Sequence, residues 1–407
     1  MRFPALQSKD FVIYMAGNFS ATNAIWINRV IVGWLGWELT GLASWVGFLS
    51  FLLYAPTISS PFFGAILDRF DLRRGTIVCH SLLTVAVAIL LVLWVMGLLT
   101  IWLLGLVALA IGFVASADRT IRLVLVPRLV DKEALTNAIA IQGLNTNTSR
   151  LIGPALGGFL IDIFGTVVAI IVNFVMFLPF LASLFIVTLR ERDAPNAKRR
   201  RFFNEIVDGA RHAASHPVIR EAMILTAVFS ITLSGVLEII PAIADGVFQR
   251  GAQGLGQMLA VAGGGALAAA ILVLMRRPRL SGPAISRAVY ISVFAGSASV
   301  IILGATSSWL AALTMVFVLG ACLTINNIDL QTSLQIALDD TYRGRVMSLW
   351  VVLVIGGIAV SAIVLGFLAD IFGMSAALIG SGATCAAIGS ANMFGNARRA
   401  SPAPPGA

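Results

Sequence analysis

Twelve apolar stretches, each of about 20 residues, run along the chain and are separated by short polar segments. A helix of that length spans the hydrocarbon core of a bilayer, so each stretch predicts one membrane-spanning helix. The chain is therefore expected to be an all-α membrane protein with 12 transmembrane helices. These cover roughly residues 11–38, 41–63, 76–97, 100–122, 136–160, 166–189, 220–243, 254–275, 284–304, 308–336, 346–369 and 374–394.

A repeated octapeptide groups these spans into larger units. GFLIDIFG begins at Gly158 and GFLADIFG at Gly366, so seven of eight letters recur 208 residues apart. A looser copy, GAILDRFD, begins at Gly64, 94 residues before the first, whereas the corresponding position at Leu272 has lost the pattern. Repeats at fixed spacing indicate duplication. The spacings predict two six-helix halves, each containing nested inverted three-helix repeats.

The predicted organisation has four parts. Apolar residues from Phe203 to Ala214 share one helical face after a basic run, which predicts an amphipathic helix on the inner leaflet. A tether between the halves is favoured over a regulatory segment. The parts are an N-terminal bundle at 1–189, a cytoplasmic linker with an amphipathic helix at 190–219, a C-terminal bundle at 220–395 and a disordered tail at 396–407.

Composition and charge agree with this assignment and set an orientation. The chain is 58% hydrophobic and 12% charged, with a mean hydropathy of +0.94, which excludes an ordinary soluble domain. Of the 28 Lys and Arg residues, 25 lie at the termini or in alternate loops, and the opposite loops hold only Arg250. This predicts a multi-pass protein of the cytoplasmic membrane with both termini in the cytoplasm. The net charge of +9 then reflects topology and attraction to anionic lipids, not nucleic-acid binding.

Several kinds of chemistry have no motif in the chain. None of the three lysines follows a glycine, so a G-x-x-x-x-G-K phosphate loop is excluded, and neither HExxH nor GxSxG occurs. The three cysteines lie inside predicted spans without metal-ligand spacing. We expect no enzyme activity, no cofactor and no metal, with a membrane enzyme as the weaker alternative.

The copy at Gly64 resembles the loop signature of the major facilitator superfamily. Matching positions are Gly64, Asp68, Arg69, Arg73 and Arg74, whereas Asp71 and Leu72 depart from the signature. Three further segments, LVPRLVDKEALTNAIA, SRLIGPALGGFL and YRGRVMSLW, resemble blocks of bacterial exporters related to the enterobactin exporter, the transmembrane secretion effector branch. The resemblance covers nearly the whole chain and implies the major facilitator fold.

That resemblance also implies a conformational latch. Asp68 would be held at the cytoplasmic start of span 11, and Arg73 would pair with Asp118 on span 4. A carboxylate at a helix N-terminus is favourable by about 0.3–1 kcal/mol, so the contact is physically reasonable. The alternative is that these arginines serve only as topological anchors.

A second resemblance lies on span 5. Gly153, Pro154, Gly157 and Gly158 match the core of an exporter-associated motif, although the upstream glycines of that motif are absent. The proline interrupts the helix ladder and the glycines permit close packing, which fits either a role in conformational change or plain helix packing.

Ionisable residues inside spans are candidates for substrate binding or coupling, because burying charge in a bilayer is costly. Arg150 lies near the middle of span 5 and shares its helical face with Gln142, Asn145 and Ser149, which predicts a polar stripe facing a water-filled cavity. The alternative is a structural arginine bonded to neighbouring helices.

Three other charged residues are candidates of the same kind. Arg29 on span 1 could contact substrate or extend toward the outer surface. Glu238 on span 7 is the best-placed acid for proton coupling, or an outer-interface residue. Asp329 on span 10 could line the inner cavity or serve a structural role. The octapeptide acids Asp162 and Asp370 are attributed to turn and cap chemistry.

These observations predict a secondary transporter that moves a small organic molecule by alternating access, and the resemblance to bacterial exporters implies that it is a proton-coupled exporter. An importer or facilitated-diffusion carrier is the alternative, followed by a transport-dead receptor or scaffold. The charges retained inside the spans favour a carrier. The expected partners are a small-molecule substrate, protons and membrane lipids, and a monomer is expected.

Overall fold

The computed structural model describes residues 4–59, 71–189, 202–275 and 285–400. Across these ranges the chain is helical and contains no strand. Nine of the helices described there are long and apolar enough to cross a membrane. The chain is therefore an all-helical integral membrane protein, whereas a total of 12 spans remains a prediction.

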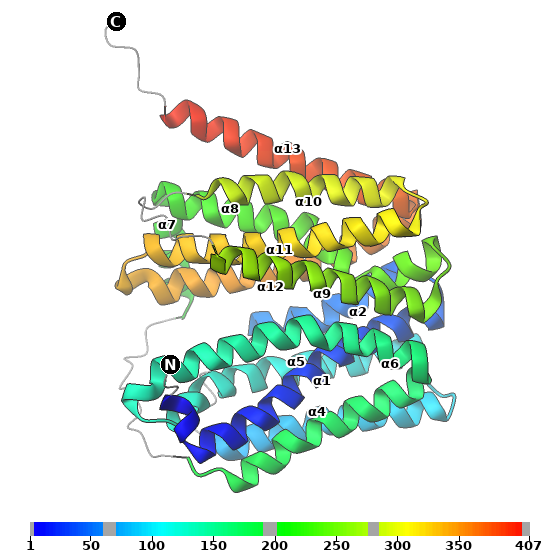
Figure 1. The fold of residues 1–407 in the computed structure, drawn as a ribbon, viewed down its shortest axis with the longest axis vertical. Coiled ribbons are helices and arrows are strands. Elements are labelled where there is room, and N and C mark those ends of the chain that lie inside the picture. Colours follow the sequence, from blue (N-terminus) through cyan, green and yellow to red (C-terminus); the bar gives the residue numbers. More distant parts are fainter. Residues whose placement is uncertain (1–3, 60–70, 190–201, 276–284, 401–407) are drawn as a thin grey trace, which may run out of the picture.

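Two groups of helices form two layers in Figure 1. The first group contains α1 (Lys9–Thr40), α2 (Ala43–Tyr54), α4 (Leu72–Val95), α5 (Ile101–Leu125) and α6 (Leu135–Ile186), with short 3-10 helices at Pro4–Gln7, Ala55–Ser59, Val126–Arg128 and Lys132–Ala134. The second contains α7 (Phe202–Ser215), α8 (Pro217–Thr232), the short helices η5 (Ser234–Leu237) and η6 (Ala242–Val247), α9 (Gly251–Met275), α10 (Arg287–Ala305), α11 (Trp309–Ala337), α12 (Asp340–Phe372) and α13 (Met374–Ala400).

Polar caps and glycines set where the helices begin and end. Ser8 and Thr100 each accept a hydrogen bond from a backbone N–H of the first turn, as N-caps do. The last glycine of each octapeptide, Gly165 or Gly373, has a positive φ of 80° or 88°. These two glycines turn the chain at corresponding places, Gly165 within α6 and Gly373 between α12 and α13.

Helix α1 is long but unusually polar for a membrane helix. Asn18, Asn23 and Asn28 on it are buried, and Arg29 follows directly. Buried polar groups need partners. The helix therefore carries a buried polar face in the protein interior.

The segment predicted as span 7, residues 220–243, is not one continuous helix. It divides into α8, the 3-10 helix η5 and the π-helix η6. Ser234 and Gly235 lie at the first break, and Pro241 immediately precedes η6. Such residues interrupt helices, and π-turns are frequent at functional sites.

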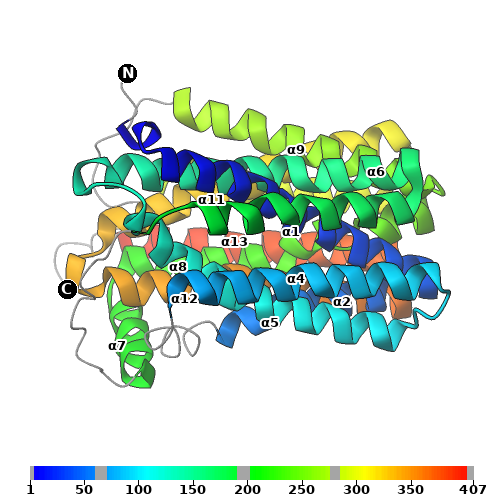
Figure 2. The ribbon, with the colours of Figure 1, turned by 90° about the horizontal axis from the view of Figure 1, so that it is seen from below.

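We call the end of the bundle where α1 begins the basic end, and the other the opposite end. The basic end carries Arg73, Arg128, Arg220, Arg287, Arg343 and Arg345. Helix α7 also lies at the basic end (Figure 2), where Asp208 is 3.9 Å from Arg345 and His212 stacks on Tyr342.

The hydrophobic core differs between the two ends. One large cluster contains residues of both helix groups, for example Leu49 and Val236. At the basic end the groups have separate clusters, one around Tyr14 and Phe180 and the other around Ile219 and Leu334. Among the described residues, the groups are thus joined toward the opposite end and have separate cores at the basic end.

The predicted linker helix corresponds to α7, and α13 continues through residues 396–400, which were assigned to the tail. Three predicted latch residues, Gly64, Asp68 and Arg69, lie outside the described residues.

Candidate functional site

A chain of hydrogen bonds joins the two helix groups near the centre of the molecule. Arg29 Nη1 on α1 donates to the Tyr54 hydroxyl oxygen at 2.9 Å. The same hydroxyl donates to Glu238 Oε1 at 2.7 Å, and Ser50 Oγ donates to Glu238 Oε2 at 3.3 Å. The carboxylate of the second group is thus held by two hydroxyls of the first.

Local structure places these groups at membrane depth. Tyr54 is the last residue of the 12-residue helix α2, so it lies about 17 Å from the opposite end, near the middle of a bilayer core. Glu238 follows the 3-10 helix η5, which is anchored by Gly235 N–H donating to Ser361 Oγ at 3.0 Å. The break in span 7 therefore positions the carboxylate.

Two aromatic rings flank the Arg29 guanidinium. Its Cζ atom lies 4.4 Å from the Trp26 ring centroid and 4.3 Å from that of Tyr54. Cation–π contacts of this kind are stronger where water is excluded. In this structure the two rings and the Tyr54 hydroxyl hold the Arg29 guanidinium in place.

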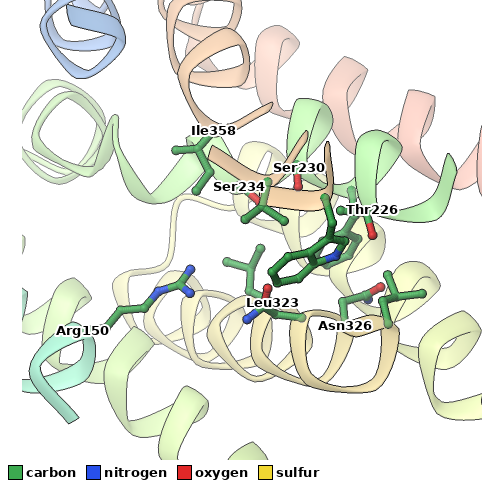
Figure 3. Close-up of a pocket in the computed structure, with 12 residues that line it drawn as sticks. Arg150, Thr226, Ser230, Ser234, Leu323, Asn326 and Ile358 are labelled. Carbon is green, nitrogen blue, oxygen red and sulfur yellow. The ribbon is translucent and has the colours of Figure 1, made fainter. Parts of the chain in front are cut away.

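A cavity lies between the helix groups beside this network. Figure 3 shows Arg150 pointing from α6 toward Ser230, Ser234 and Leu323 of the second group. Arg150 supplies the positive charge of the cavity wall, while α8, η5, α11 and α12 supply its other lining residues. These are Thr226, Phe229, Ser230, Ser234, Leu323, Asn326, Asn327, Leu330, Trp350, Val354 and Ile358.

The polar stripe predicted around Arg150 faces in two directions. Gln142 accepts a hydrogen bond from Asn18 at 3.0 Å, and Ser149 accepts one from Asn23 at 3.0 Å, so both contact α1. Asn145 is buried, and among the described residues neither of its side-chain polar atoms has a hydrogen-bond partner. The expectation that the whole stripe faces a cavity is therefore wrong for Gln142 and Ser149, because α1 covers that side of α6.

Arg119 lies near this network but is not among the site residues predicted from the sequence. Helix α5 continues to Leu125, which puts Arg119 inside the membrane-spanning segment, within electrostatic range of Arg29 and Tyr54. The sequence signal that could have identified Arg119 is a charged residue inside an apolar stretch. Tyr54 gave no such signal, since a lone tyrosine in a span is unremarkable in sequence.

The predicted ion pair between Arg73 and Asp118 is not formed. Arg73 donates to the backbone oxygens of Leu184 and Phe185, both at 2.6 Å. Asp118 is fully buried and pairs with Arg122, one helical turn further along α5. The prediction is wrong for this structure because a nearer arginine on the same helix occupies the carboxylate.

Asp118 and Arg122 belong to a buried polar cluster inside the first group. Arg122 Nη1 donates to Asn18 Oδ1 at 2.8 Å, and His80 Nδ1 lies 4.0 Å from Asp118 Oδ1. His80 is enclosed by the rings of Phe177 and Phe180.

Side chains also close the opposite end across the two groups. Trp37 Nε1 on α1 donates to Asp245 Oδ2 at 2.8 Å. The backbone N–H groups of Ala43 and Ser44, at the start of α2, donate to the two carboxylate oxygens of Asp370, each at 2.9 Å. Asp370 is thus a helix cap, as the sequence analysis proposed, but it caps a helix of the other group.

The span 5 glycines make the close contacts that their motif predicts. A Cβ atom at Gly153 would meet Trp26 Cβ at 2.4 Å, and one at Gly157 would meet Val30 Cβ at 3.2 Å, both on α1. A Cβ at Gly158 would lie 2.5 Å from the Cα of Gly256 on α9, in the other group. The same segment of α6, which contains Pro154, thus packs against a helix of its own group and contacts a helix of the other group.

The remaining acids lie apart from this network. Asp329 is half-buried on α11, two residues beyond Asn327 of the cavity wall. Asp162 is exposed near Gly165. Across the described ranges, no group of three or more His, Cys, Asp or Glu side chains could hold a metal ion.

Comparison with known proteins agrees with this architecture. The Enterobactin exporter EntS of Escherichia coli O1:K1 / APEC is 26% identical over 263 residues, 63% of this chain and 60% of that protein. The same values hold for EntS of Escherichia coli O9:H4 (strain HS), so the chain spans about 60% of the length of these curated relatives.

Solved transporters share the fold. A bacterial homolog of the human lysosomal transporter Spinster, inward-facing and unoccupied, superposes with a TM-score of 0.76 at 12% identity, covering 96% of this chain and 97% of that one. The nucleoside transporter NupG gives 0.71 at 13% identity, covering 95% and 98%. At such identities the likeness shows the fold alone.

A family model decides the assignment. The model described as "Transmembrane secretion effector" matches residues 3–400, nearly the full sequence. Its members are transporters and not enzymes. The chain therefore belongs to the transmembrane secretion effector family of major facilitator transporters.

Proposed function

We propose that this transporter exports a small organic molecule from the cytoplasm in exchange for protons. The observation that carries the proposal is the hydrogen-bonded chain from Arg29 through Tyr54 to Glu238, which crosses between the helix groups beside the cavity. A titratable acid in such a contact can couple protonation to the relative position of the groups. The similarity to an enterobactin exporter supports the direction.

Alternating access is supported by the difference between the two ends. The opposite end is joined by the Asp370 and Trp37 contacts, whereas the cores at the basic end are separate. With the basic end in the cytoplasm, as its arginines favour, this state would receive cargo from inside. A single chain of two six-helix halves would carry out the cycle as a monomer.

The two ends would be closed in turn by related contacts. Asp370, in the octapeptide copy beginning at Gly366, caps α2 at the opposite end. Asp68, in the copy beginning at Gly64, would cap the start of α12 at the basic end when that end closes. Both contacts place a carboxylate at a helix N-terminus, where partial positive charge favours it. Arg69, Arg73 and Arg74 would support the second contact.

The direction of transport can be tested with oriented membrane vesicles. Inside-out vesicles carrying the full chain should accumulate substrate when their lumen is acidified, and an uncoupler should abolish accumulation. A panel of siderophores, anionic dyes and drugs would serve as probes. Accumulation only in right-side-out vesicles would contradict export and favour an importer.

The role of Glu238 can be tested separately. Glu238→Gln keeps the shape of the side chain and removes its proton exchange, so proton-driven accumulation should be lost while substrate counterflow between equal pH compartments continues. Glu38→Gln is a matched control, because Glu38 is exposed near the end of α1. Intact proton-driven accumulation in Glu238→Gln would remove this residue from the coupling mechanism.

A further inference from the structure

Three arginines from three helices of the first group lie near one another, and one of them, Arg150, lines the cavity. Arg29 on α1 lies within electrostatic range of both Arg119 on α5 and Arg150 on α6. The side chains of Arg119 and Arg150 are exposed, although both residues lie within membrane-spanning segments. Within the described residues, neither makes a hydrogen bond or an ion pair. Their guanidinium donors are therefore available to a ligand.

The acids nearby do not balance these charges. Glu238 of the other group attracts Arg150 electrostatically, but its carboxylate oxygens accept hydrogen bonds from the hydroxyls of Tyr54 and Ser50. Asp118 attracts Arg119 electrostatically, yet it already forms an ion pair with Arg122. Asp329 has an interaction of its own. In the described part of the chain, the three guanidiniums are thus offset by one carboxylate, that of Glu238, which leaves two positive charges in excess.

The surroundings of the arginines add a preference for flat rings. Trp26 lies against Arg29 and 5.9 Å from the Cζ of Arg150, so its ring borders both cations. Trp350 and Phe229 contribute to the facing wall, together with hydroxyl and amide side chains. Arginines bind carboxylates through two parallel hydrogen bonds, and aromatic walls stack on planar groups.

We propose that the cargo is an aromatic organic anion with about two negative charges, bound at Arg150 in the cavity and attracted by the nearby charges of Arg29 and Arg119. This inference rests on the proposed transport function and specifies the class of substrate. A neutral or cationic molecule would leave the excess positive charge unbalanced in a region of low polarity, whereas a dianion neutralises it. A cationic molecule would also be repelled by the three guanidiniums.

Two dyes with the same three-ring frame and opposite charge test the proposal. The full-length protein is reconstituted in phosphatidylcholine vesicles, so that no anionic lipid competes for the arginines. Transport of carboxyfluorescein, an anion, is compared with transport of rhodamine 123, a cation. We expect carboxyfluorescein to be transported about 10-fold faster or more, as the loss of a charged hydrogen bond would imply.

Variants connect this preference to the site. Arg119→Gln and Arg150→Gln should each lower carboxyfluorescein transport about 10-fold and reduce the preference over rhodamine 123. Arg250→Gln is the matched control, because Arg250 is exposed at the opposite end beside Trp309 and should leave transport unchanged. Size-exclusion chromatography would verify that each variant is folded.

The outcomes separate the two proposals. A preference for rhodamine 123, or an anion preference unchanged in both arginine variants, would overturn the anion assignment and leave transport standing. Transport of neither dye by folded wild-type protein would count against both. Selective binding of carboxyfluorescein, seen as quenching of tryptophan fluorescence without transport, would support the anion site and contradict the transport function.

Discussion

At the scale of single residues, Tyr54 is the link on which the contact between the helix groups depends. Its hydroxyl accepts from Arg29 and donates to Glu238, and its ring also covers the guanidinium. Tyr54→Phe keeps the ring and removes both hydrogen bonds. We expect closure of the opposite end to weaken by about 1.5–3 kcal/mol, because one of the lost bonds is to a carboxylate.

The measurement is the reactivity of a single cysteine placed at the opposite end with a maleimide, which should rise in Tyr54→Phe. Tyr290→Phe is a matched control, since Tyr290 donates to Glu221 within one helix group. Equal reactivity in Tyr54→Phe and wild type would show that the hydroxyl does not hold this end closed.

The buried pair of Asp118 and Arg122 has a different role, which is stability. Asp118→Asn would leave the Arg122 charge without its partner in a buried site, which costs about 3–5 kcal/mol. The melting temperature of the purified protein should fall, and the double variant Asp118→Asn with Arg122→Gln should recover part of the loss. If the double variant is no more stable than the single one, the cost does not come from an unpaired charge.

At the scale of helices, the contact between Asp370 and the start of α2 predicts a shift in conformation. Asp370→Ala removes a helix cap that only the closed opposite end can form, worth about 0.5–2 kcal/mol. The population open at that end should increase. Spectroscopic distances between labelled α2 and α12 would report it.

Asp162→Ala provides the comparison for that experiment. Asp162 occupies the same place in the other octapeptide copy, yet it is exposed, and within the described residues its carboxylate accepts no hydrogen bond. We expect this variant to match wild type. Equal opening in both variants would mean that the octapeptide acids act locally and not between the helix groups.

Glycine contacts give a second prediction at this scale. Gly158→Val would place methyl groups against the backbone of Gly256 and so prevent α6 and α9 from meeting. Transport should be lost while the melting temperature changes little. Gly143→Val on the same helix meets no neighbouring atom within 4 Å and should retain transport. Normal transport by Gly158→Val would show that the close approach is dispensable.

Hydropathy predicted most of the fold at the scale of the whole molecule, because lipid imposes its thickness on each apolar stretch. The expected span at 308–336, for instance, is α11, Trp309–Ala337. The broken span 7 was missed, although Ser234, Gly235 and Pro241 mark it, because hydropathy does not distinguish a helix from its short 3-10 and π relatives.

The site was predicted less completely than the fold. Charge inside spans made Arg29, Arg150 and Glu238 candidates, since such charge is costly in a bilayer, and the structure brings these three residues near one another. Tyr54 and the pairing of Asp118 with Arg122 were missed, because a sequence shows which residues share a helix face but not which other helix covers that face. The contacts that join the two groups depend on that tertiary arrangement.

The central claim is that the two ends of the molecule open in turn, and paired distance measurements test it directly. One pair of spin labels would be attached at Leu98 and Ser307 at the opposite end, and another at Glu133 and Arg287 at the basic end. All four positions are exposed. Changing pH and adding substrate should lengthen one distance while shortening the other. Two distances that stay fixed, or lengthen together, would contradict alternating access.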